Sequence, residues 1–144
     1  MAKLARDVMT PDPVCCSPRA TLDEVARMMV DNNCGEISIV DDAKLIGVIT
    51  DRDIVCCSIA DGKNPMDCTV DAYMTRPAIA VRGDAPLDEV ILTMEEHQIR
   101  RVPVVEKGFC AGIISQADLA VFTQPPQIAE LLCEVSRDTG RPSL

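Results

Sequence analysis

Aromatic residues are almost absent from this chain of 144 residues. Tyr73, Phe109 and Phe122 are the whole set, 2% of the sequence, and there is no Trp. A folded core must therefore be aliphatic, and a bound base would meet aliphatic side chains rather than stacked rings. Hydrophobic residues still make up 47% of the chain, which is enough to build such a core and argues against wholesale disorder.

Basic residues are the second shortage: 14 Lys and Arg stand against 23 Asp and Glu, a net charge of −9. This field repels a phosphate backbone, so binding to nucleic acid or to an anionic membrane is not expected. One phosphorylated small molecule is not excluded, because it needs only local donors. No apolar run approaches the ~20 residues of a membrane span, and the first residues lack the apolar stretch of a secretion signal. We therefore expect a cytoplasmic protein, whose thiols are reduced.

Signatures of catalysis and of metal binding are missing as well. None of the eight cysteines forms a C-x-x-C pair, and the single histidine, His97, has no cysteine close by in sequence, so we expect no metal site. His97 has no matched nucleophile, and no dinucleotide fingerprint occurs, so we expect no enzyme. His97 falls near a predicted helix end, where a cation is favourable.

The eight cysteines allow two interpretations. The simpler one is that most of them are small buried hydrophobic residues. The adjacent pairs Cys15-Cys16 and Cys56-Cys57 keep a second one open, in which the protein is a thiol-redox or metal-responsive interaction protein with no nucleotide bound.

The chain consists of one pattern written twice. When the sequence is shifted by 65 residues it aligns with itself without a gap. The 48 aligned pairs from Val8 to Val55 include 12 identities. Self-similarity of this kind indicates an internal repeat. We place the first repeat at residues 5–60, a linker at 61–69, the second repeat at 70–123, and a short helix with a polar tail at 124–144.

Each repeat has the pattern strand, helix, strand, strand, helix. The helix of the first repeat should begin at Thr21, which with Glu24 has the form of a capping box, and in the second repeat Pro86 suits the first helical position. Behind them an apolar stripe recurs at helical spacing. The predicted strands are residues 13–16, 36–40 and 45–50, then 78–81, 101–105 and 110–115, and the closing helices are 51–60 and 116–122.

A second pattern lies where the third strand of each repeat meets the closing helix. It runs from Gly47 to Asp53 and again from Gly112 to Asp118, with Thr50 or Ser115 at the junction and an aspartate three residues later. Ordinary helix capping accounts for this arrangement. The same geometry could bind a ligand, because the hydroxyl can donate to phosphate and the carboxylate can accept from ribose hydroxyls. The two glycines could let backbone or ligand approach closely. Arg52 could contact phosphate or form a solvated ion pair.

These features together resemble a tandem pair of CBS domains, a Bateman module. The resemblance rests on Val8-Met9-Thr10 and Tyr73-Met74-Thr75, on Arg101-Val102-Pro103-Val104-Val105, and on the two glycine-to-aspartate endings. It implies an α/β (α+β) fold of two β-α-β-β-α repeats about a pseudo-twofold axis, usually as a homodimer. It also implies a non-catalytic sensor that binds AMP, ADP or ATP, or else NAD or S-adenosylmethionine, in clefts between the repeats and signals to a separate effector protein.

The resemblance implies a set of binding residues. Asp53 and Asp118 would hold ribose, Thr50 and Ser115 would lie near ribose and phosphate, and Arg101 would reach phosphate. Backbone around Val14-Cys15 and Ile79-Ala80 would recognise adenine. The full predicted set is Val14, Cys15, Thr50, Arg52, Asp53, Ile79, Ala80, Arg101, Pro103, Ser115 and Asp118.

The two repeats differ at one informative place. Where the second repeat has Arg100-Arg101, the first has Gly35-Glu36, so one predicted cleft is more positive than the other. Arg52 favours the first cleft for a phosphate and Arg101 favours the second. We therefore expect two unequal sites and leave open which of them is filled.

Overall fold

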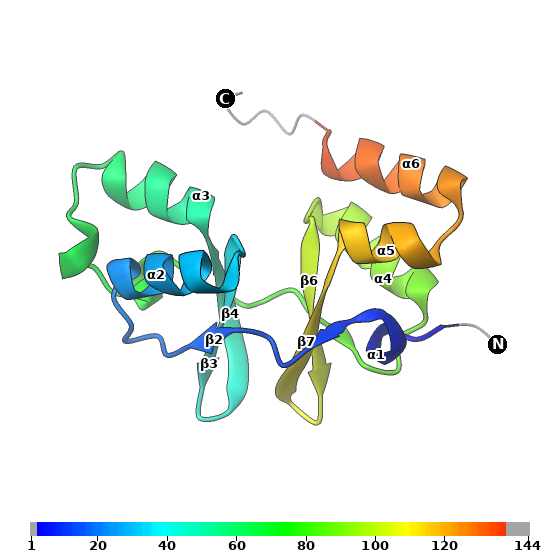
Figure 1. Cartoon of the computed structure of the whole chain (residues 1–144), viewed down its shortest axis with the longest axis horizontal. Helices are drawn as coiled ribbons and strands as arrows, with labels where there is room; N and C mark the ends of the chain where they lie inside the picture. The colour runs from blue at the N-terminus through cyan, green and yellow to red at the C-terminus, as the bar shows by residue number, and fades with distance from the viewer. Residues whose placement is uncertain (1–2, 138–144) are drawn as a thin grey trace. The chain divides into compact units, whose positions relative to one another are not determined.

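The computed structural model describes residues 3–137 of the chain, and its helices and strands are shown in Figure 1. The fold is mixed α/β, with two small sheets and helices. The elements of the first repeat are α1 (Ala5–Val8), β1 (Thr10–Pro11), β2 (Cys15–Cys16), α2 (Leu22–Asn32), β3 (Glu36–Asp41), β4 (Lys44–Thr50), α3 (Asp51–Asp53) and a π-helix (Ile54–Ile59). Those that follow are two 3-10 turns (Pro65–Asp67 and Val70–Ala72), β5 (Val81–Arg82), α4 (Leu87–His97), β6 (Arg101–Glu106), β7 (Phe109–Ser115), α5 (Gln116–Phe122) and α6 (Pro125–Val135).

Helix α2 forms from the predicted apolar stripe, but its start differs from the expected capping box. Leu22, Val25 and Met29 are buried on one face. Thr21 is the N-cap residue, yet its side chain makes no capping hydrogen bond. The N–H of Leu22 donates instead to the carbonyl oxygen of Cys68 at 3.0 Å, so a backbone group from elsewhere in the chain satisfies this helix end. The capping-box prediction at Thr21 and Glu24 is therefore wrong.

Helix α4 also starts one residue later than predicted, because Pro86 is its N-cap and Leu87 its first residue. His97 lies in its last turn, as expected. The prediction for residues 51–60 holds only in part, since α3 is one turn long and continues as a π-helix. Helix α5 matches the predicted range, and α6 contains the predicted apolar stripe. The predicted polar tail lies outside the described residues from position 138 onward.

Both hairpins form where the sequence predicts them. Strands β3 and β4 pair antiparallel with Asp41 opposite Lys44, and Asp42 and Ala43 take positive φ values of 51° and 66° at the turn. The hairpin of β6 and β7 turns at Lys107 and Gly108, with φ values of 54° and 85°. Two successive residues of positive φ match the right-handed twist of a two-residue hairpin.

The two repeats exchange their opening segments. Thr10 of the first repeat pairs with Ile113 in β7 of the second, and Thr75 of the second repeat bridges to Val48 in β4 of the first. Both pairs are related by the same 65-residue shift that relates the sequences. The resulting sheets have the orders β1-β7-β6-β5 and β2-β3-β4.

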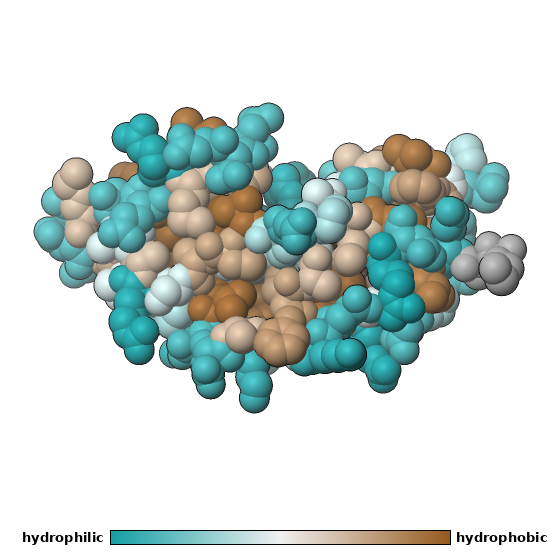
Figure 2. All heavy atoms as spheres, turned by 60° about the horizontal axis from the view of Figure 1, so that its bottom comes forward, coloured by the Kyte–Doolittle hydropathy of each residue, from teal (hydrophilic) through white to brown (hydrophobic). Residues whose placement is uncertain are grey.

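The exchange also divides the chain into two compact units that do not follow the repeat boundaries. One unit contains the segment that ends at Pro11, residues 80–104 and the chain from Gly112 onward; the other contains residues 12–79 and 105–111. Each unit has its own aliphatic core, and the exchanged segments contribute Ala5 and Val8 to one core and Val70 to the other. Apolar residues also reach the surface in patches among polar ones on the face drawn in Figure 2.

The cysteines differ from the simpler interpretation. All eight lie within the described residues, and none of them is fully buried. Cys56, Cys57 and Cys133 are exposed, and the others are half-buried. Cys16, Cys34 and Cys68 do pack against the core of residues 12–79, but the prediction that most cysteines are buried is wrong.

Candidate functional site

The junction of β4 and α3 is a complete capping box. The N–H of Asp53 donates to Thr50 Oγ1 at 3.1 Å, and the N–H of Thr50 donates to Asp53 Oδ2 at 2.9 Å. Both residues are half-buried. The helix-capping interpretation is therefore confirmed. It does not exhaust either group, because a hydroxyl can donate while it accepts and a carboxylate has a second oxygen.

The three-stranded sheet brings further predicted residues to this junction. Thr50 lies opposite Glu36 at the start of β3, and Cys15 of β2 lies opposite Ser38 on the other side of β3. The N–H of Ser38 donates to the Val14 carbonyl oxygen at 3.3 Å. Val14, Cys15 and Thr50 therefore converge on the same end of one sheet, although Thr50 is far from the other two in sequence.

The junction of β7 and α5 repeats this geometry in the other unit. The N–H of Asp118 donates to Ser115 Oγ at 3.2 Å, and the N–H of Ser115 donates to Asp118 Oδ2 at 2.9 Å. The N–H of Gln116 donates to the Arg100 carbonyl oxygen at 3.0 Å. This bond places the start of β6, where the exposed Arg101 stands, beside the start of α5.

The remaining predicted residues are divided between the two units. Arg52 is exposed on α3 and Ile79 is half-buried, both in the unit that holds Thr50 and Asp53. Ala80 directly precedes β5, and Pro103 is buried in β6, both in the unit that holds Ser115 and Asp118. The predicted binding residues are therefore divided between the two units, and the unit boundary separates Ile79 from Ala80.

Gly47 and Gly112 make room for protein rather than for a ligand. A Cβ on Gly47 would lie 2.7 Å from the carbonyl oxygen of Thr75, and one on Gly112 would lie 2.8 Å from that of Thr10. Each glycine therefore receives the opening segment of the other repeat. The sequence contained a sign of this contact, because the Met-Thr openings and the glycines both repeat with the same 65-residue shift. It did not say which repeat the openings would contact.

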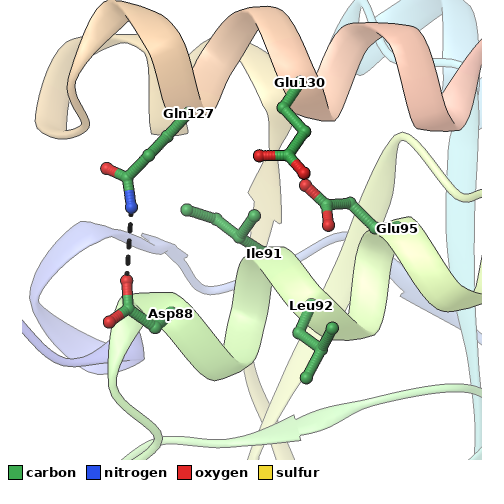
Figure 3. A pocket seen from close by; sticks show the side chains of 6 residues that line it. All are labelled: Asp88, Ile91, Leu92, Glu95, Gln127 and Glu130. Carbon is green, nitrogen blue, oxygen red and sulfur yellow. Dashed lines mark hydrogen bonds between the residues drawn. The ribbon is translucent and has the colours of Figure 1, made fainter.

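A hollow of about 240 Å³ lies between α4 and α6 (Figure 3) and contains no predicted site residue. Its lining is Asp88, Ile91, Leu92, Glu95, Gln127 and Glu130. Figure 3 shows the carboxylates of Glu95 and Glu130 pointing toward one another from the two helices. Burial raises the pKa of Glu95 above its ordinary value, and the nearby Glu130 and Glu134 raise it further. An acidic lining of this kind disfavours a nucleotide anion.

The Glu95 carboxylate should weaken the packing of α6 at neutral pH. Because its pKa is raised on folding, the folded state binds more protons between the unfolded and folded pKa values, so stability rises as the pH falls through that window. Glu95→Gln is expected to stabilise the protein at pH 7 by about 0.5 kcal/mol, since it removes a like-charge contact. Thermal melts from pH 4 to pH 8 check this.

The matched control is Glu96→Gln, the exposed neighbour on the same helix, which should leave the melting temperature unchanged. The gain from Glu95→Gln should shrink toward pH 4, where the wild-type carboxyl is protonated. A gain of the same size at every pH would contradict this account.

The sequence profile of the CBS domain matches residues 5–58 and 70–122. The chain belongs to the CBS-domain family. Among its relatives, it is 37% identical to hypoxic response protein 1 of Mycobacterium tuberculosis over 117 residues, 81% of this chain and 82% of that protein. It is 36% identical to the uncharacterized protein YlbB of Bacillus subtilis over 139 residues, which cover 94% of this chain and 93% of that one.

Solved structures agree with this assignment. Hypoxic response protein I with two coordinated zinc ions superposes on the CBS pair with a TM-score of 0.78 at 35% identity, covering 85% of this chain and all of that one. The CBS domain pair of protein MJ0100, solved with 5′-methylthioadenosine and S-adenosyl-L-methionine, superposes with a TM-score of 0.76 at 29% identity and covers 85% of this chain and 96% of that one. The tandem CBS fold predicted from the sequence is confirmed, and the chain is a regulatory module of this class.

The described residues were also compared with the requirements of a metal site and of a membrane span. Within residues 3–137, no three His, Cys, Asp or Glu side chains are grouped so that they could hold a metal ion. None of the helices in this part of the chain has both the length and the hydropathy needed to cross a bilayer.

Proposed function

We propose that this CBS pair is a non-catalytic sensor that binds an adenine nucleotide, AMP, ADP or ATP, and signals to a separate effector protein. The observation that carries the proposal is the repeated sheet end. In each unit a hydroxyl and an aspartate meet where a strand runs into a helix, and in one unit the sheet register brings Val14 and Cys15 to the same end. The adenosine derivatives bound to the CBS pair of MJ0100 support the same ligand class.

In this proposal the capping groups also contact the ligand. The second oxygen of Asp53 or Asp118 accepts from ribose hydroxyls, and the hydroxyl hydrogen of Thr50 or Ser115 is donated to a ribose or phosphate oxygen. Backbone at Val14 and Cys15, or at Ile79 and Ala80, recognises the adenine edge. Arg52 and Arg101 attract the phosphates, and Pro103 packs beside them. No group in this arrangement attacks or deprotonates the ligand.

The proposal includes a homodimer. Three large apolar side chains are exposed on α2 and on the π-helix that follows α3, namely Val30 at 73%, Val55 at 55% and Ile59 at 52%. A contiguous exposed apolar patch is typical of a protein interface, and the proposal is that these three side chains belong to one. The same class of surface would serve an effector protein.

The test is a panel of AMP, ADP, ATP, NAD and S-adenosylmethionine in a thermal-shift assay, followed by calorimetry. A nucleotide at a hundredfold excess over its Kd stabilises the folded state by ~2.7 kcal/mol, a rise of roughly 5–10 °C for a chain of this size. If none of the five compounds moves the melting temperature, the proposal is wrong.

Two variants separate ligand binding from helix capping. Asp53→Asn and Asp118→Asn keep a capping acceptor but lose the charge that favours ribose, and together they should abolish the shift. Asp7→Asn is the matched control, because Asp7 Oδ2 accepts from the N–H of Leu4 at 2.9 Å in the same kind of cap at α1. It should bind nucleotide as the wild-type protein does.

A further inference from the structure

The fold brings Cys15 and Cys110 together although they are 95 residues apart in the sequence. Their thiols are hydrogen-bond partners. The backbone accounts for this contact. Pro11 lies opposite Gly112 in the antiparallel pairing of β1 with β7, so the chain on either side of that pair stays close. Residues 105–111 also belong to the same compact unit as residues 12–79.

The adjacent cysteine pairs noted in the sequence have no such geometry. Successive side chains of a strand point to opposite faces, and Cys16 packs against the core, so Cys15 faces the other way. Cys56 and Cys57 follow one another on the π-helix and are exposed, and neighbours on a helix do not face each other. The structure therefore pairs Cys15 with Cys110, and not with the adjacent Cys16 that the sequence suggested.

The surroundings of Cys15 favour a reaction with Cys110 of the same chain. It is half-buried, and its Sγ donates to the Pro13 carbonyl oxygen at 3.3 Å. Ser38, its register partner across β3, stands between the core residues Ile37 and Ile39 and so lies on the same sheet face as Cys15. Cys15 is thus held by its pairing with β3, and its thiol interacts with that of Cys110.

We propose that Cys15 and Cys110 form a reversible intrachain disulfide, which makes this CBS pair responsive to peroxides. In the first step one thiol reduces a peroxide such as H₂O₂, becoming a sulfenic acid and releasing water. In the second step the sulfur of the other thiol attacks the sulfenic sulfur, the S–S bond forms, the S–O bond breaks, and the thiol proton leaves in a second water. A dithiol reductant reverses the reaction and is itself oxidised to a disulfide.

The rate of this reaction should depend on pH. The hydrogen bond with Cys110, together with burial, raises the pKa of the Cys15 thiol. Burial and the nearby Glu24 raise the pKa of Cys16 to about 11. Because the thiolate is the reactive species, oxidation should be slow at neutral pH and faster in alkaline solution. The disulfide would then form during sustained exposure to oxidant rather than during a brief pulse.

The disulfide should have a large effect on stability. A bond between Cys15 and Cys110 closes a loop of most of the chain and restricts the unfolded state. The melting temperature should rise by about 10 °C on oxidation. If the proposed nucleotide function holds, the bond would also immobilise the backbone at Cys15 that contacts adenine. This last consequence rests on that function, whereas the bond and the melting shift do not.

The experiment uses the full chain, reduced and then treated with graded H₂O₂, alkylated, and digested with trypsin without reductant. We expect the peptide 7–19 to be linked to the peptide 108–137, with a loss of about 2 Da per chain, and the link should disappear with dithiothreitol. Each peptide carries two cysteines, so the variant Cys16→Ser with Cys133→Ser is the matched control, and it should still form the link and show the melting shift.

Cys110→Ser and Cys110→Ala should each lose both the link and the melting shift, and the alanine variant serves if serine disturbs the fold. A wild-type protein that forms only links between chains, or only sulfinic acids, would overturn the proposal. So would an unchanged melting temperature in a protein that carries the link. None of these outcomes depends on whether a nucleotide binds.

Discussion

Replacing Gly112 by alanine is expected to lower the free energy of unfolding by about 3 kcal/mol and the melting temperature by roughly 10 °C. The added Cβ would lie 2.5 Å from Met9 Sδ and 2.8 Å from the carbonyl oxygen of Thr10. The methionine side chain can turn away, but the carbonyl can move only if β1 separates from β7. Alanine at this position therefore opposes the exchange of opening segments that completes the core.

Gly47→Ala should behave alike, because its Cβ would lie 2.7 Å from the Thr75 carbonyl oxygen. The two glycines lie in different units, so their effects should add. The sum is comparable with the whole stability of many domains, and the double variant should be largely unfolded at 37 °C. Chemical denaturation followed by circular dichroism measures all three variants.

Gly35→Ala is the matched control. A Cβ there would lie 3.0 Å from Asp51 Oδ2, the far end of an exposed side chain that can rotate. The loss should stay below about 1 kcal/mol, a small fraction of the effect at a site that cannot relax. If Gly112→Ala melts at the wild-type temperature, the close approach of Met9 and Thr10 is wrong.

Reversing the charge of Arg101 should weaken the binding of AMP by tenfold or more, which corresponds to about 1.4 kcal/mol. Arg101 starts β6 beside the Ser115 cap, where the first repeat has Glu36. A charge near a bound phosphate contributes on this scale even when solvent screens it. The measurement is calorimetry of Arg101→Glu in the Asp53→Asn background, so that binding reports on the Ser115 and Asp118 site.

Two controls make this result specific. Adenosine has no phosphate, so its affinity should be the same with and without Arg101→Glu. Arg137→Glu changes the net charge by the same amount at the end of α6, where Arg137 pairs with Glu134, and it should leave AMP binding unchanged. Equal loss of adenosine and AMP would mean that Arg101 supports the fold of the site rather than the phosphate. In that case the two sites would not differ through this charge.

Much of this protein is readable from its sequence because the decisive patterns are local or repeated. The 65-residue register predicted two copies of one unit. The apolar stripes predicted α2 and α4, and the hairpins formed between the expected strands. The caps at Thr50 and Ser115 were predicted as well, because a capping box needs only residues three positions apart.

The tertiary structure decided what depends on residues far apart in the chain. Sequence spacing could not show that each opening segment packs into the other repeat, that Cys68 rather than the Thr21 side chain satisfies the start of α2, or that Cys15 meets Cys110. It also could not show that Glu95 faces Glu130. The physical reason is the same in each case. Periodicity and capping act within a turn or a strand. These contacts are instead selected by how each unit packs its aliphatic core. Because aromatic residues are scarce, that packing depends on many aliphatic side chains.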